Sequence, residues 1–166
     1  VKLNASGTYV WARQLGGTSY DYGFDVAVDA SGNTYVTGYF FGTADFDPGA
    51  GTANLTIAGN SPDAYVVKLD TSGTYVWARQ FGGSSQDQSF GVAVDASGNT
   101  YVTGSFTGTA DFDPGAGTAN LTSGEMGDGY VAKLDASGTY VWARQFGGSS
   151  QDHSREVAVD ASGNTY

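Results

Sequence analysis

The chain of 166 residues contains no cysteine, only three prolines and a single histidine. The lack of cysteine excludes disulfide bonds and cysteine-based zinc sites. The few prolines exclude a proline-rich linker and a collagen-like chain. No apolar run approaches the roughly 18 residues that a membrane-spanning helix needs, so the sequence predicts no membrane span.

Positive charge is also scarce, because Lys and Arg number 7 against 17 Asp and Glu, which gives a net charge of −10. Proteins that bind the phosphates of nucleic acids carry clustered Lys and Arg, so we expect no nucleic-acid partner. With two glutamates and one histidine, the usual acid–base groups of enzymes are nearly absent. The composition therefore argues against catalysis.

Glycine is abundant, with 26 residues, about twice its usual share. Hydrophobic residues make up 40% of the chain and aromatic residues 14%. Chains that stay disordered have fewer apolar and aromatic residues than this. The composition therefore predicts a folded protein with many turns.

The chain is a tandem repeat with a period of about 65 residues. The string TYVWARQFGGSSQD begins at Thr74 and at Thr139, and its first seven letters also begin at Thr8. The string VAVDASGNTY begins at Val26, Val92 and Val157, and GTADFDPGAGTANLT begins at Gly42 and Gly108. Such a period is typical of a repeat architecture, of which this chain holds about two and a half copies.

Each period contains four short segments rich in Val, Tyr and Thr, a pattern that predicts β-strands. In the second period these strands are Phe90–Asp95, Asn99–Asp113, Tyr130–Asp135 and Thr139–Phe146. Asp-x-Ser-Gly turns join the first strand to the second and the third to the fourth. Four antiparallel strands with short turns, repeated radially, describe the blade of an all-β propeller.

Between the second and third strands lies a longer insert. Asp113-Pro114-Gly115 suits a type II turn, and the flanking strings TADFD and TANLT could pair as an extension of the hairpin. The once-per-period residues Trp11, Trp77 and Trp142 are expected to pack between neighbouring sheets.

The predicted units are a half blade at residues 1–16, complete blades at 17–82 and 83–147, and a second half blade at 148–166. A propeller closes with about four to eight blades, so we expect an incomplete ring. Its natural partners would be further blades of the same parent chain or other copies of itself.

Three strings carry a family resemblance: G-G-x-S-x-D, then V-A-V-D-x-S-G-N-x-Y-V-T-G, then Y-V-x-K-L-D-x-S-G. They resemble the bacterial β-propeller repeat family, also called the seven-bladed propeller repeat and related to NHL-type propellers. The resemblance implies large secreted or cell-surface proteins of prokaryotes, and it implies neither a known reaction nor catalytic residues. The insert departs from the common form and makes these blades longer than the usual 40–45 residues or so.

The connections between strands two and three and between strands four and one should emerge on one loop face. Aromatic and polar residues that differ between copies gather in these regions, and such variation is what ligand binding uses. The candidate binding residues are Tyr20, Tyr22, Tyr39, Phe41, Gln88 and His153. The alternative is that loop tips simply tolerate change.

Paired aspartates are the candidate metal ligands. Asp45 with Asp47, and Asp111 with Asp113, stand beside the Pro-Gly turn, and calcium prefers several such oxygens. The alternative reading is that they cap the turn. Asp21, Asp87 and Asp152 follow the Gly-Gly pair of each copy, where we expect them to accept backbone N–H groups rather than to bind a cation. No cofactor other than calcium is suggested.

The leading functional hypothesis is a non-enzymatic extracellular or cell-surface module with a structural or surface-assembly role, able to form polymers or filaments. The competing hypothesis is a ligand-binding propeller, lectin-like or adhesive, that binds glycans through the loop face.

Overall fold

The computed structural model describes all 166 residues, which form fifteen β-strands and no helix. None of its segments is a helix long and apolar enough to cross a membrane. The first blade consists of β4 (Asp21–Val28), β5 (Thr34–Phe40), β8 (Asp63–Leu69) and β9 (Tyr75–Gly83). The second consists of β10 (Asp87–Val94), β11 (Thr100–Phe106), β14 (Asp128–Leu134) and β15 (Tyr140–Phe146).

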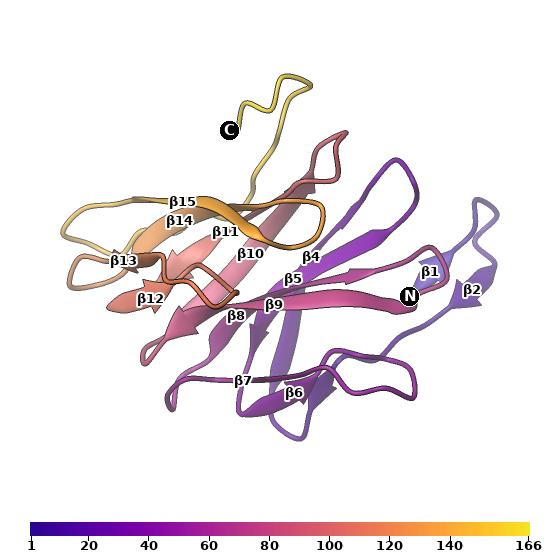
Figure 1. Cartoon of the computed structure of the whole chain (residues 1–166), viewed down its shortest axis with the longest axis horizontal. Coiled ribbons are helices and arrows are strands. Elements are labelled where there is room, and N and C mark those ends of the chain that lie inside the picture. The colour runs from indigo at the N-terminus through magenta and orange to yellow at the C-terminus, as the bar shows by residue number, and fades with distance from the viewer.

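Within each blade neighbouring strands pair antiparallel in chain order, as the repeat pattern predicted. The two sheets lie face to face, with the short strands β1 (Lys2–Leu3) and β2 (Tyr9–Trp11) beyond the first blade and the C-terminal segment beyond the second (Figure 1). In that last segment Val159 bridges Thr165, the start of a further hairpin. The all-β fold with propeller blades is confirmed, and the sheets do not close into a ring within these residues.

The predicted second strand, Asn99–Asp113, is too long. Strand β11 ends at Phe106, and Gly108, with a φ of 72°, turns the chain before β12 (Thr109–Asp111) begins. Because β-branched and bulky residues disfavour positive φ, glycine is what lets the chain leave the blade at this point. Strand β12 then pairs with β13 (Asn120–Thr122), so the insert is a hairpin of its own.

The insert hairpin extends the sheet of the preceding blade, not its own blade's hairpin as predicted. Strand β12 pairs with Gly82 and Gly83 at the end of β9, and β6 (Thr43–Asp45), which is paired with β7 (Asn54–Thr56), does the same with β3 (Gly16–Gly17). A side chain on Gly83 would collide with the Thr109 carbonyl oxygen, so glycine is needed for this close approach. Backbone hydrogen bonds thus join one blade to the next.

A second junction contact involves the recurring VWAR string. Arg79 donates from Nε to the Gly138 carbonyl at 2.7 Å and from Nη2 to the Ser137 carbonyl at 3.0 Å. Its guanidinium lies 5.4 Å from the Trp77 ring centre, and the Trp77 indole N–H donates to the Ala136 carbonyl at 3.4 Å. The outer strand of one blade therefore holds the turn of the next, an arrangement we call the Trp–Arg clasp.

The clasp recurs at the earlier junction with the same partners shifted by one repeat. Arg13 donates to the carbonyls of Gly73 and Ser72, both at 2.8 Å, and Trp11 donates to that of Thr71 at 3.2 Å. A bidentate guanidinium on two carbonyls fixes direction as well as distance. Both copies of the turn end in a glycine of positive φ. The VWAR and Asp-x-Ser-Gly strings bind each other, which explains why they recur together in the sequence.

The larger hydrophobic core lies between the blades. It comprises 14 buried residues, in which Tyr35, Val66 and Trp77 of the first blade meet Val92 and Val102 of the second, among others. Trp11 and Trp77 are buried, which confirms the predicted packing between sheets for these two. Trp142 is half-buried.

Replacing Trp77 by Ala is expected to lower the free energy of unfolding by about 3–5 kcal/mol, because it empties the space of a buried indole and breaks the clasp. Trp142→Ala is the matched control, since the same strand sequence there lacks a neighbouring turn, and its loss should be clearly smaller. Chemical denaturation followed by tyrosine and tryptophan fluorescence measures both. Equal losses would contradict the junction role of Trp77.

Candidate functional site

Six ring side chains form a continuous aromatic strip across the inner strands of the two blades: Tyr22, Phe24, Tyr39, Phe41, Phe90 and His153. Ring centres of Tyr22 and Tyr39 are 4.8 Å apart, and those of Phe24 and Phe90, which joins the two blades, are 5.3 Å apart. Tyr22 is 43% exposed and Phe24 49%, so the strip faces outward. Exposed aromatic side chains gathered in this way are unusual unless something covers them.

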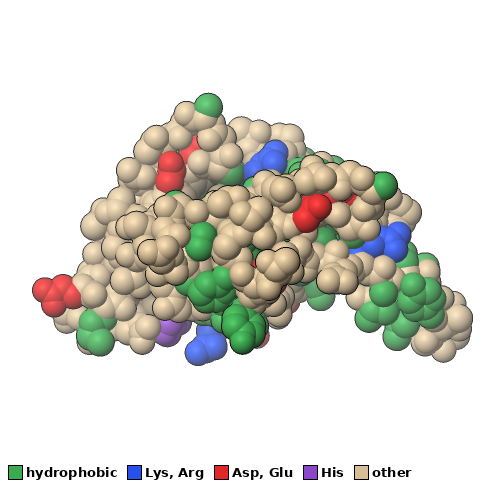
Figure 2. Space-filling model, turned by 90° about the horizontal axis from the view of Figure 1, so that it is seen from below, with side chains coloured by type: hydrophobic (Ala, Val, Ile, Leu, Met, Phe, Trp, Pro, Cys, Tyr) green, Lys and Arg blue, Asp and Glu red, His purple; other side chains and the backbone are tan.

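Strand geometry explains how the aromatic strip forms. Tyr22 of β4 stands opposite Tyr39 of β5, and Phe24, which lies at a register shift between Gly23 and Asp25, packs its ring on both of them. Phe90 of β10 lies one repeat further along. Arg155 places its guanidinium 5.7 Å from the Phe90 ring centre. Figure 2 shows hydrophobic side chains and a basic one gathered beside the chain's single histidine.

The structure brings together four of the six predicted binding residues, namely Tyr22, Tyr39, Phe41 and His153. Tyr20 is 75% exposed and stacks on no other ring, while Gln88 lines a small hollow that it shares with His153. Tyr22 lies on a strand rather than at a loop tip, because the first strand of each blade begins earlier than predicted, at Asp21 and Asp87, and Tyr39 lies within the second strand, β5.

Sequence reasoning missed Phe24 and Phe90 as members of the strip. The available signal was the alternation of Tyr22 and Phe24, which puts both on one face of an extended strand. The packing of Phe24 on Phe90 had no local signal, since it depends on how the blades sit together.

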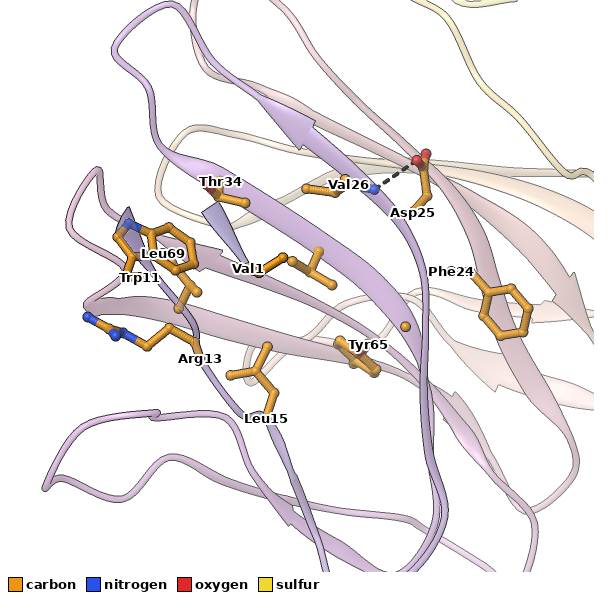
Figure 3. A pocket seen from close by; sticks show the side chains of 12 residues that line it. Val1, Trp11, Arg13, Leu15, Phe24, Asp25, Val26, Thr34, Tyr65 and Leu69 are labelled. Atoms are coloured by element: carbon orange, nitrogen blue, oxygen red, sulfur yellow. Dashed lines mark hydrogen bonds between the residues drawn. The ribbon is translucent and has the colours of Figure 1, made fainter. Parts of the chain in front are cut away.

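An apolar groove of about 440 Å³ lies between the N-terminal segment and the first blade, and Phe24 of the aromatic strip lines one part of it. Figure 3 shows Trp11, Arg13 and Leu15 on one side and Val26, Thr34 and Tyr65 on the other. At the next junction the corresponding surface around Val92 and Val102 is covered by the first blade. The groove is therefore the uncovered face of a blade junction.

The four aspartates predicted as calcium ligands hold the tip of the insert hairpin. Asp45 Oδ1 accepts the backbone N–H groups of Asp47 at 2.9 Å and Ala53 at 2.8 Å, and Asp47 Oδ1 accepts that of Gly49 at 2.8 Å. These bonds hold the pKa of Asp45 below its usual value. Asp111 and Asp113 make the same bonds in the second blade. Turn capping is thus observed, and calcium at these residues stays a prediction.

The aspartates that follow each Gly-Gly pair also accept backbone N–H groups, as expected. Asp21, Asp87 and Asp152 accept from Gly17, Gly83 and Gly148, each at 2.8 Å. What the sequence did not reveal is that Asp63 and Asp128, each at the start of a blade's third strand, face two of them. We call Asp63 with Asp87, and Asp128 with Asp152, the junction pairs.

Burial raises the pKa of both members of the first junction pair. Asp63 is 0% and Asp87 1% exposed. Desolvation raises the pKa of Asp63 to about 6, although hydrogen bonds from Ala58 and Gln80 oppose the shift. Desolvation, aided by the charge of Asp63, raises that of Asp87 to about 8. Positive charge makes no contribution at either carboxyl, so each favours its neutral form.

These shifts predict that, in a buffer containing EDTA, stability falls as pH rises. A carboxyl whose pKa is raised by folding stabilises the protein fully below its unfolded value of 3.8 and loses that contribution as pH passes about 6 and then about 8. Aspartates whose pKa is lowered by folding, such as Asp95 and Asp135, change the stability only at pH values below this range. Urea unfolding at several pH values should show the decline, and Asp87→Asn should flatten it. An unchanged slope in that variant would contradict the assignment.

Comparison with known proteins supports the architecture. A family model described as a beta-propeller repeat matches residues 10–39 and 76–113. Over 99% of its length the chain is 24% identical to an uncharacterized WD repeat-containing protein of Acanthamoeba polyphaga mimivirus, and over 98% it is 26% identical to the regulatory protein FlaEY of Caulobacter vibrioides. The chain spans 13% and 17% of the lengths of these two relatives.

Both matched stretches contain the VWAR string and the first strand of a blade, and the second also reaches the D-F-D string at residues 111–113, so the family model rests on elements that build the blades and their junctions. With two complete four-stranded blades and a family match that reaches into each, the chain is built from β-propeller repeats.

Proposed function

We propose that this chain is a non-catalytic structural module of an extracellular or cell-surface protein, in which identical blade junctions build a stiff, extendable array. The observation that carries the proposal is the repetition of two junction contacts, the Trp–Arg clasp and the insert hairpin, with the same partners at successive junctions. Contacts that recur in each repeat make stability a sum over neighbours, which suits a protein that grows by adding units.

The acidic groups support a structural role over catalysis. The carboxylates of the hairpin tips are engaged by backbone N–H groups, and a junction pair recurs at the junctions that follow the first and the second blade. An active site is normally made once in a chain, so a repeated constellation favours a role in holding repeats together. His153, the only histidine, is exposed at the end of the aromatic strip.

The array is proposed to extend by covering the apolar groove with a second copy. Val26, which lines this groove, is 59% exposed, whereas its counterpart one repeat later, Val92, is 5% exposed beneath the first blade. The segment Val157–Tyr166 repeats the sequence of the inner strands, so the same segment of another copy offers the matching surface. Burial of apolar area would drive this association.

We therefore expect the purified chain to sediment as more than one copy at micromolar concentration, and electron micrographs to show regular particles or filaments. Val26→Lys should shift the distribution toward single copies, because it puts a charge in the groove. Val76→Lys is the matched control, since Val76 is exposed on β9 outside the groove. A folded, strictly single-copy wild type would refute self-association.

The aromatic strip favours a second candidate, a lectin-like or adhesive propeller that binds glycans. Tyr and Phe rings offer flat apolar faces at low entropic cost, and Tyr adds a polar tip, which suits sugar rings. A glycan array with one strong group of hits would support this function. Tyr39→Ala should then lose binding while Tyr20→Ala, outside the strip, keeps it. An array without hits would leave the structural role as the sole candidate.

A further inference from the structure

The two carboxyl groups of the first junction pair converge on one small space above Gly82. A methyl group added to Gly82 would lie 2.7 Å from Asp63 Oδ1 and 2.9 Å from Asp87 Oδ2. Residue 82 must be glycine, because any side chain at this position would fill the space into which both carboxyl groups point. Asp63 comes from the first blade and Asp87 begins the second, so the space lies at the blade junction.

Each of these carboxyl groups has an oxygen without a partner. Asp63 Oδ2 accepts from Ala58 N at 3.2 Å and from Gln80 Nε2, and Asp87 Oδ2 accepts from Gly83 N. Asp63 Oδ1 and Asp87 Oδ1 accept nothing, although both side chains are almost wholly buried. Leaving a buried acceptor unpaired destabilises the fold, and more so when the acceptor is charged, so the two oxygens need an electropositive partner.

The same arrangement recurs at the next junction, one repeat along. A methyl group on Gly147 would lie 2.6 Å from Asp128 Oδ1 and 2.9 Å from Asp152 Oδ2. Asp128 Oδ1 is again buried without a partner. A main-chain carbonyl oxygen, that of Gly148, lies near the same carboxyl group. A methyl group added to Gly124 would contact this oxygen and would lie 3.4 Å from Asp128 Oδ1.

We propose that each junction pair binds a hard divalent cation of the calcium class, which links one blade to the next. The donors are all oxygens, the type that Ca²⁺ and Mg²⁺ select, and Ca²⁺ tolerates irregular geometry at about 2.3–2.6 Å. No third acidic or histidine side chain joins either pair, so the remaining ligands are main-chain carbonyls such as that of Gly148. A shared proton is the competing way to neutralise the pair.

The test measures calcium binding to the purified chain, in whatever assembly it forms, by calorimetry at pH 7.5 after EDTA treatment and dialysis. CaCl₂ is titrated up to about 10 mM, which covers the weak affinities of extracellular calcium modules. We expect about two Ca²⁺ per chain, one for each junction pair. We also expect a higher melting temperature in CaCl₂ than in EDTA, because a ligand that binds only the folded state stabilises it.

Variants assign the sites. Asp63→Asn should halve the bound calcium, and Asp63→Asn combined with Asp128→Asn should abolish both binding and the shift in melting temperature. Asp47→Asn combined with Asp113→Asn tests the other calcium candidates, the hairpin tips, and if the ions lie at the junction pairs this variant still binds two Ca²⁺. Asp152→Asn, at a half-buried position, repeats the test for the second pair if Asp128→Asn prevents folding, which circular dichroism reveals.

Two results would overturn the proposal. One is a wild-type chain that binds no calcium and melts at the same temperature in CaCl₂ and EDTA, which assigns the pair to a shared proton. The other is calcium binding that survives the Asp63→Asn, Asp128→Asn variant and disappears in the hairpin-tip variant.

Discussion

The junction between blades is the constraint on which the rest of this structure depends. A single four-stranded sheet cannot bury both of its faces, so each blade needs a neighbour. The turn carbonyls of Ser137 and Gly138 receive the guanidinium of Arg79, and the backbone of Gly82 and Gly83 receives the insert hairpin. Directional hydrogen bonds of this kind fix the relative position of two sheets, which apolar packing alone leaves free to slide.

The same junctions contain the least favourable groups in the molecule. Burying Asp63 and Asp87 together sets desolvation and like-charge repulsion against folding. Asp87 also accepts the Gly83 N–H and so shapes the connection from which β10 starts. Asp87 therefore orders the junction but weakens it when its carboxyl group is charged. The strength of the link between repeats then depends on what neutralises that charge.

Whether the sequence predicts an interaction depends on how far apart its residues lie in the chain. Strands and Asp-x-Ser-Gly turns were predictable because the alternation and the turn residues lie within a few positions of each other. The pairing of β12 with β9 was not, because strand TADFD carries no sign of whether its partner lies in its own blade or the one before. Asp63 was missed for the same reason: it reads as the polar start of a strand, and only the approach of Asp87 gives it another role.

The residues that hold the blades together repeat along the chain, whereas those that distinguish one blade from the next do not. The Trp and Arg side chains of the clasp, the Gly-Gly pair and the insert hairpin are the same in successive copies. The aromatic strip is not periodic, because Tyr22, Tyr39 and Phe41 of the first blade become Gln88, Ser105 and Thr107 in the second. The junction contacts need only the repeated residues, so the strip positions are free to change without loosening the array. Recognition that distinguishes one blade from the next must therefore come from positions that break the repeat.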